Sequence, residues 1–214
     1  FLSSTIEDFR NFFKVNKKKS TFHTESVVNR AISLVGAQFK NHEIEIIKDI
    51  EDIKITNLQN ELIQVIINIL NNARDELVKK DKNLDKIILI NTQLKEDKII
   101  IVIKDNAGGI PLDIVDRIFE PYFTTKHQSQ GTGIGLYMSR EIINKNMQGD
   151  IKAYNGTFMY EKTEYMGAVF KISLPLKNEN SNKKMDEKKS IEYLIKHTNQ
   201  IDWWAFSANE SDEV

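Results

Sequence analysis

Apolar residues at spacings of three and four mark the helices that the sequence predicts. The stripe in residues 1–13 is typical of a helix end, and a second helix covers Thr24–Phe39, whose first residue is a plausible N-cap. A third helix, 62–77, has about five turns and one buried face. A fourth begins within 131–146, after closely spaced glycines. Helices therefore recur along the whole chain.

Short stretches rich in Ile and Val predict strands between these helices. The strands are expected at 44–50, 86–94, 98–104 and 168–174. Glu96-Asp97, between two of them, reads as a hairpin turn. Strands that alternate with helices and end in antiparallel hairpins predict an α/β fold, in which one mixed sheet is covered by helices on one face.

Composition narrows the class of protein. With 214 residues the chain suits one domain plus short appendages, and 40% hydrophobic residues predict a folded core. The net charge is -1, so no global field attracts nucleic acid or a membrane surface, and we expect direct contact with neither. Any polyanion must be bound at a local site.

The chain carries no cysteine and no apolar run of the roughly 18–20 residues that cross a bilayer. Disulfides and thiolate metal sites are therefore excluded, and a cytoplasmic location is expected. The first residue is Phe, which is typical of a fragment or processed chain. A membrane-anchored parent protein is left open.

Closely spaced glycines precede the fourth helix in the segment Gly131-Thr132-Gly133-Ile134-Gly135-Leu136. Glycines let backbone N–H groups approach an anion, and a helix start favours phosphate. The segment is not a Walker loop, because no Lys-Ser or Lys-Thr follows the last glycine. It is not a Rossmann fingerprint either, because no acidic residue of that type lies about 20 residues on after a strand. A phosphate site and a plain glycine turn both remain open at this point.

Two further segments carry polar side chains at the ends or faces of elements. Asp105, in 105–111, follows a strand and precedes glycines, so it either presents a carboxylate to a purine amine or makes a turn. Asn68 and Asn72 are four residues apart and share one helix face. Their amide oxygens suit a Mg²⁺-phosphate contact, with a solvated polar face as the alternative.

Aromatic residues gather between the two glycine segments, in 118–126. Phe119, Tyr122 and Phe123 are expected there in a surface connection. Exposed aromatics in a long loop fit a lid that closes over a ligand.

Taken together, the four segments resemble the N, G1, F and G2 boxes of histidine kinase catalytic domains, in order and spacing. The resemblance covers 20–176 and implies the Bergerat fold, a two-layer α/β sandwich with a mixed sheet under about three helices. Residues 1–16 look like the end of the second dimerisation helix, an N-terminal helix remnant. Residues 177–214 are predicted to be a polar linker and a tail of unknown role.

The resemblance also implies a role for each site residue, with ATP and Mg²⁺ as ligands. Asp105 would read the adenine amine, beside the backbone of Gly109 and Ile110. Asn72 would bind Mg²⁺, and two residues would act in catalysis, Asn68 near the phosphates and Lys126 at the γ-phosphate. The triphosphate would be held by the last segment, at Gly131, Thr132, Gly133, Gly135 and Leu136.

Two departures from the family pattern are visible. Position 107 is Ala where many relatives have Gly, and Asp75-Glu76 stands where many membrane sensors have Lys-Tyr. The pattern resembles the nitrogen-regulator type. Gyrase and MutL resemble each other in placing a Glu at the position of Asn68, where it activates water for hydrolysis. The carboxamide of Asn68 cannot act as such a general base, so the resemblance disfavours hydrolysis of ATP by water.

The resemblance therefore implies a two-component sensor kinase whose catalytic domain transfers the ATP γ-phosphoryl group to a histidine. None of His23, His42, His127 and His197 lies in the sequence context of an acceptor. We expect the acceptor on a dimerisation domain largely absent from this chain, in a parent that is a homodimer and serves a cognate response regulator. A pseudokinase that binds nucleotide without transfer, and an interaction domain that binds none, are the alternatives.

Overall fold

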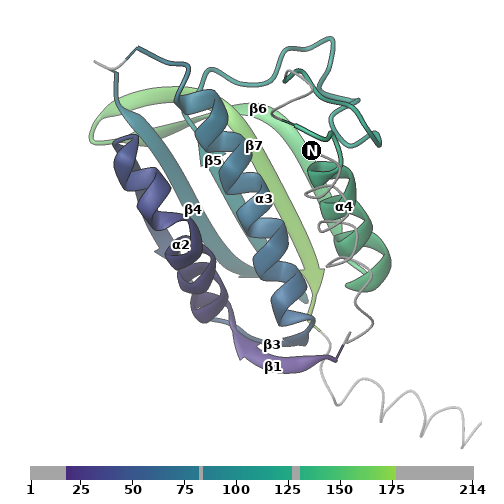
Figure 1. The fold of residues 1–214 in the computed structure, drawn as a ribbon. Helices are drawn as coiled ribbons and strands as arrows, with labels where there is room; N and C mark the ends of the chain where they lie inside the picture. Colours follow the sequence, from purple (N-terminus) through teal and green to yellow (C-terminus); the bar gives the residue numbers. More distant parts are fainter. Residues whose placement is uncertain (1–17, 82–83, 127–130, 177–214) are drawn as a thin grey trace, which may run out of the picture. The chain divides into compact units, whose positions relative to one another are not determined.

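Helices lie on one face of a five-stranded mixed sheet (Figure 1). The computed structural model describes residues 18–81, 84–126 and 131–176. Within these ranges the helical layer consists of α2 (Thr24–Asn41), α3 (Gln59–Leu77) and α4 (Gly135–Glu141), the last continuing as the π-helix η1 (Ile142–Asn146). The predicted two-layer α/β sandwich is confirmed.

The large sheet has the strand order β2-β4-β5-β7-β6. Only β2 and β4 pair in parallel, while the other neighbouring strands pair antiparallel. A separate small sheet joins β1 to β3. The strands are β1 (Ser20–His23), β2 (Ile44–Ile50), β3 (Lys54–Asn57), β4 (Lys86–Lys95), β5 (Lys98–Asp105), β6 (Asp150–Tyr160) and β7 (Thr163–Pro175).

Four strands and three helices lie where the hydrophobic pattern predicted them, and β1, β3 and β6 were not predicted. The turn Glu96-Asp97 is confirmed, because Lys95 and Lys98 face each other across β4 and β5. Thr24 is not the N-cap of α2, since that position falls on His23. The Thr24 hydroxyl instead donates to the Glu51 carbonyl at 3.0 Å and accepts from an N–H at 2.9 Å.

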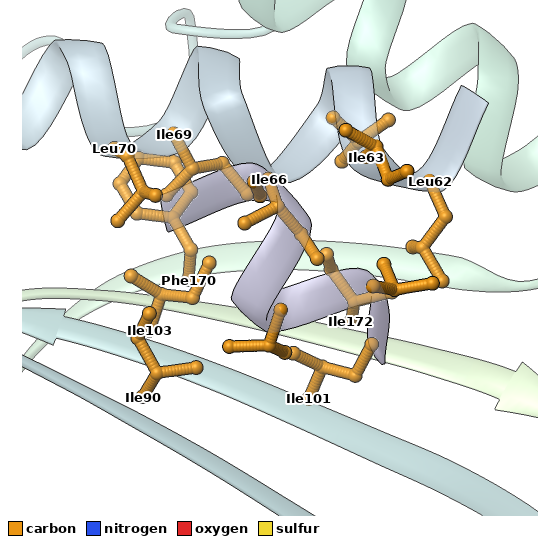
Figure 2. Packing of buried hydrophobic residues seen from close by; sticks show 14 of the residues in the cluster. Leu62, Ile63, Ile66, Ile69, Leu70, Ile90, Ile101, Ile103, Phe170 and Ile172 are labelled. Atoms are coloured by element: carbon orange, nitrogen blue, oxygen red, sulfur yellow. The ribbon is translucent and has the colours of Figure 1, made fainter. Parts of the chain in front are cut away.

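The core lies between α3 and the sheet. Figure 2 shows aliphatic side chains of α3 pointing toward side chains of β4, β5 and β7. Because a helix buries residues at spacings of three and four, the opposite face of α3 stays free for polar residues. The contacting residues labelled in Figure 2 are Leu62, Ile63, Ile66, Ile69, Leu70, Ile90, Ile101, Ile103, Phe170 and Ile172.

The hairpin of β6 and β7 is long, and the residues near its turn reach β2, the strand at the opposite edge of the sheet. The Tyr165 hydroxyl lies 2.8 Å from an oxygen of Asp85, beside β4. The Tyr160 hydroxyl lies 3.1 Å from an oxygen of Glu45, on β2. Because β2 and β6 are the opposite edges of the sheet, these contacts require the hairpin to curl back, as its pale green ribbon does in Figure 1.

Several predictions fall on residues that the structure does not describe. They are the dimerisation-helix remnant at 1–16, the linker and tail at 177–214, and the contexts of His127 and His197. Among the described residues, no helix is long and apolar enough to span a bilayer.

Candidate functional site

A cavity of about 730 Å³ lies among α3, the loop that follows β5, the start of α4 and part of β7. Its volume is in the range of small-molecule sites, which run from about 300 to 1,000 Å³. Four segments far apart in the sequence therefore meet at one place. The cavity is lined by every residue proposed from the sequence, namely Asn68, Asn72, Asp105, Gly109, Ile110, Lys126, Gly131, Thr132, Gly133, Gly135 and Leu136.

Asp105 ends β5, and its carboxylate is fixed from two sides. Its Oδ1 accepts the N–H of Ala107 at 2.9 Å and the N–H of Ala168, on β7, at 3.2 Å. A Cβ added to Gly167 would lie 1.7 Å from the Asp105 carbonyl oxygen, so only glycine permits this approach of β7. No hydrogen bond within the described residues involves Oδ2. This oxygen is therefore the acceptor left for a ligand.

The electrostatic surroundings of Asp105 favour its protonated form more than water does. Burial, which leaves the residue 4% exposed, raises the pKa of the carboxyl above its usual 3.8. The two backbone hydrogen bonds oppose this change, and the negative charge of Glu76 adds to it. A buried carboxylate with one unused oxygen is suited to accept a hydrogen bond from a ligand.

The loop after β5 is held by a residue that the sequence analysis missed. Asn155, on β6, receives the Ile110 N–H on Oδ1 and donates from Nδ2 to the Ile110 carbonyl, both at 2.7 Å. Gly109 has φ +95°, and a Cβ there would lie 2.7 Å from Asn155 Oδ1. The contact with Asn155 thus requires a glycine at position 109. The sequence had suggested a different reason for this glycine, the close approach of a purine.

Asn68 is oriented by α4. Its Nδ2 donates to the Gly135 carbonyl and to the Ser139 hydroxyl, each at 3.3 Å. Because a carbonyl only accepts, the amide must point its nitrogen toward α4. The Asn68 Oδ1 is then an acceptor that can face a cation or a water, and the buried Ser139 hydroxyl helps to keep it so.

Lys126 lies against the polar face of α3. Its Nζ is 2.6 Å from Asp75 Oδ2 and 3.1 Å from Asn72 Oδ1. Arg74 also pairs with Asp75, at 2.6 Å. Burial alone would raise the pKa of Asp75, but the two cations outweigh it and hold that pKa below its usual 3.8. The acidic residue that departs from the family pattern is therefore the partner of the loop lysine.

The glycine segment packs against the loop that carries Lys126. Gly133 has φ +67°, and a Cβ there would lie 2.5 Å from the backbone carbon of Tyr122. A Cβ added to Gly131 would lie 3.0 Å from the Thr124 hydroxyl and 3.3 Å from the Lys126 side chain. At these two glycines a side chain would push the two loops apart.

The aromatic loop differs in part from the expectation of exposed rings. Phe119 is 9% exposed and belongs to the core, with the Arg140 guanidinium 5.7 Å from its ring centre. Phe123 is half-buried and lines the cavity. Tyr122 alone of the three is well exposed, at 70%. The loop is therefore anchored to the core at Phe119 and Phe123, while Tyr122 faces away from it.

The oxygen donors around Lys126 are of the kind that a magnesium ion accepts. The described residues contain no cluster of three or more His, Cys, Asp or Glu side chains that could hold a metal. Mg²⁺ is often held by one or two protein oxygens together with phosphates and water. Asn72 Oδ1 and Asp75 Oδ2 both accept from one cation, the Lys126 ammonium. These residues fit a Mg²⁺ shared with phosphate.

The residues missed by the sequence analysis share one property: each acts through a contact distant in sequence. Asn155 is 45 residues from Ile110, and Ser139 is 71 residues from Asn68. No local periodicity or motif marks such partners. Asp75 was visible as a departure from the family pattern, but its pairing with Lys126 was not.

Comparison with known proteins gives a family. Residues 57–178, more than half of the chain, match the family described as "Histidine kinase-, DNA gyrase B-, and HSP90-like ATPase". Sporulation kinase E of Bacillus subtilis is 34% identical over 167 residues, which are 77% of this chain and 21% of that protein. The two-component sensor PprA of Pseudomonas aeruginosa is 33% identical over 68% of this chain and 15% of its own length. The chain thus spans about a fifth of these relatives.

Among solved structures, the catalytic domain of the histidine kinase ThkA has the same fold. The two superpose with a TM-score of 0.61 and 24% identity, over 74% of this chain and 96% of that one. The sheet and its helical layer are thus those of this fold. The chain belongs to the family of histidine kinase-, DNA gyrase B- and HSP90-like ATPases.

Proposed function

We propose that this chain is the ATP-binding catalytic domain of a two-component sensor histidine kinase, which transfers the γ-phosphoryl group of ATP to a histidine. The observation that carries the proposal is one cavity that is lined both by a buried carboxylate and by a set of amide, lysine and glycine residues. Such a cavity matches a molecule with a purine at one end and a polyanion at the other.

At the base end, Asp105 accepts a hydrogen bond from the adenine amine through Oδ2. Its other oxygen is already used by two N–H groups, so the carboxylate is oriented before the ligand arrives. Gly109 and Ile110 present backbone to the ring from the adjacent loop. A preorganised acceptor loses little entropy on binding, which favours affinity.

At the phosphate end, Asn72 is proposed to hold Mg²⁺, with Asn68 Oδ1 beside it. The metal, when bound, neutralises phosphate charge and polarises the γ-phosphoryl group. Lys126 contributes a cation to the γ-phosphate after exchanging its present partners. The phosphates approach the backbone of the glycine segment, at Gly131, Thr132, Gly133, Gly135 and Leu136.

The proposed phosphate site offers no carboxylate at position 68 to activate water, which favours transfer to a histidine over hydrolysis. Asn68 occupies the position where a carboxylate could take a proton from water, and its nitrogen is turned to α4. The described histidines, His23 and His42, do not line the cavity. The acceptor is then on the dimerisation domain of a homodimeric parent, and the product serves a response regulator. The fold neighbour ThkA has been crystallised in complex with response regulator protein TrrA.

We place the domain in the cytoplasm, where ATP is available, whether or not its parent is anchored in a membrane. The runner-up, a pseudokinase, would bind nucleotide in the same cavity but transfer nothing. The two functions differ only when an acceptor is supplied.

The test supplies that acceptor separately. The chain is mixed with a histidine-bearing dimerisation domain of the parent protein and with ATP labelled at the γ-phosphate. Acid-labile label on the histidine is expected with Mg²⁺ and not with EDTA, and Asp105→Ala should abolish it. Nucleotide binding without any labelled acceptor would point to the pseudokinase. Stoichiometric phosphohistidine on the isolated chain would contradict the separate acceptor.

A further inference from the structure

The base end of the cavity is held by one rung of the β6–β7 hairpin. Asn155 and Ala168 face each other in the antiparallel ladder of these strands. The Ala168 N–H donates to Asp105, and the Asn155 amide binds both backbone groups of Ile110. We propose that Asn155 is a positioning residue that sets the distance between the carboxylate and the loop, and so the fit of the base. The inference rests on the proposed function.

The two hydrogen bonds of Asn155 imitate a strand partner. Its Oδ1 accepts the Ile110 N–H and its Nδ2 donates to the Ile110 carbonyl, both at 2.7 Å. The orientation of the amide is settled, because a backbone N–H only donates and a carbonyl only accepts. A carboxamide is the side chain of this length that offers both groups side by side, which an aspartate at neutral pH does not.

Gly109 makes the close approach of Asn155 possible. With φ +95° and a Cβ position 2.7 Å from Asn155 Oδ1, any other residue would push the amide away from the loop. The neighbouring Gly108 N–H donates to the Met166 carbonyl on β7 at 3.2 Å. The loop is thus attached to both strands of the hairpin, by Gly108 to β7 and by Ile110 to β6.

The same hairpin fixes Asp105. Gly167 packs on the backbone of Asp105, and the next residue, Ala168, binds its Oδ1. The carboxylate and the Gly109–Ile110 backbone are therefore both positioned relative to the Asn155–Ala168 rung. Loss of Asn155 would leave the carboxylate in place but release the loop that faces it.

The experiment compares ATP with inorganic triphosphate, which has no base. Both are titrated calorimetrically, with Mg²⁺, into the wild type, Asn155→Ala and Asn155→Asp. ATP affinity is expected to fall about tenfold in both variants, which corresponds to about 1.4 kcal/mol. The affinity for triphosphate should stay within about twofold. Hydrogen exchange at the Ile110 amide should become faster in both variants.

The matched control is Asn91→Ala. Asn91 also bonds a backbone carbonyl with its side chain, that of Asp49, but does not line the cavity. The control should leave the ratio of ATP to triphosphate affinity unchanged. Asn155→Asp has nearly the same volume, so it carries the test if Asn155→Ala does not fold.

Three outcomes would distinguish a failure of the inference from a failure of the function on which it rests. Faster exchange at Ile110 with an unchanged affinity ratio would overturn the positioning role of Asn155, and so would an unchanged exchange rate in both variants. Failure of the wild type to bind ATP any better than triphosphate would instead overturn the proposed base site itself.

Discussion

Replacing Asp105 with Asn should reverse the hydrogen-bonding character that the cavity offers to a purine. In the wild type, Oδ1 accepts two backbone N–H groups and Oδ2 is left for the ligand. The Asn amide oxygen must take over the two N–H groups, because its nitrogen cannot accept them. The nitrogen then replaces Oδ2 at the cavity, and an acceptor becomes a donor.

The size of the effect follows from the bonds exchanged. A hydrogen bond to a charged group contributes about 1.5–3 kcal/mol, so ATP affinity should fall about 10- to 100-fold. Inosine triphosphate carries an oxygen in place of the amine and would gain a neutral bond of about 0.5–1.5 kcal/mol. The preference for ATP over inosine triphosphate should therefore shrink about 30-fold or more.

Calorimetric titration of both nucleotides into the wild type and Asp105→Asn measures this preference directly. Asp105→Ala is the structural control, because it leaves the N–H groups of Ala107 and Ala168 without this acceptor, each at a cost of about 1–3 kcal/mol. Its unfolding free energy should fall by about 2–6 kcal/mol, while that of Asp105→Asn should change by less than about 1 kcal/mol. If Asp105→Asn kept the wild-type preference for ATP, the carboxylate would not be the group that reads the base.

Three further predictions concern charge and packing. Burial raises the pKa of the Asp105 carboxyl above its usual 3.8, so this carboxyl takes up a proton at a higher pH in the folded chain than in the unfolded chain. As the pH falls through the raised value, the folded chain therefore gains stability relative to the unfolded chain, whereas ATP affinity falls. Calorimetric titrations from pH 7 down through the raised value should show this loss of affinity in the wild type and not in Asp105→Asn. A double-mutant cycle of Lys126→Met and Asp75→Asn, followed by urea unfolding, should give a coupling of about 1–2 kcal/mol, because both side chains are largely buried and the bond is charged; a coupling under about 0.3 kcal/mol would contradict the pair. Ile66→Ala, in the fully buried face of α3, should cost about 2–5 kcal/mol by the same method, and Leu34→Ala, which is 55% exposed, less than about 0.5 kcal/mol.

Much of the fold could be predicted because its core strands and helices carry strong periods. β5 (Lys98–Asp105) has an unbroken run of five Ile and Val residues between its charged ends, and α3 repeats its apolar residues over about five turns. β1 and β3 escaped prediction because each has only four residues. β6 was not predicted because Asn, Gly and Thr interrupt its apolar positions. Only two of its eleven residues are buried, so the strand needs few apolar side chains.

The candidate site was predictable where its residues form local segments. Asn68, Asp105 and the glycines of 131–135 stand in segments whose spacing alone suggests a ligand, and the fold brings these segments to one cavity. Their supports were not predictable, because Asn155 and Ser139 act across the fold from ordinary-looking strand and helix positions. Phe119 was misjudged for the same reason, since only the packing of its loop decides that it is buried.

The two ends of the cavity are held by different forces, and this sets what each end must do when a ligand binds. The base end is fixed by hydrogen bonds to the β6–β7 hairpin, from the Ala168 N–H to the Asp105 carboxylate and between Asn155 and Ile110, and these can persist in the complex. At the phosphate end, the Lys126 ammonium bonds Asn72 Oδ1, the oxygen proposed for the metal. A metal cannot share that oxygen with a cation 3.1 Å away without strong repulsion, so Lys126 must exchange its partners as the phosphates enter. Binding of the base therefore requires little rearrangement, whereas binding of the triphosphate is coupled to movement of the loop lysine.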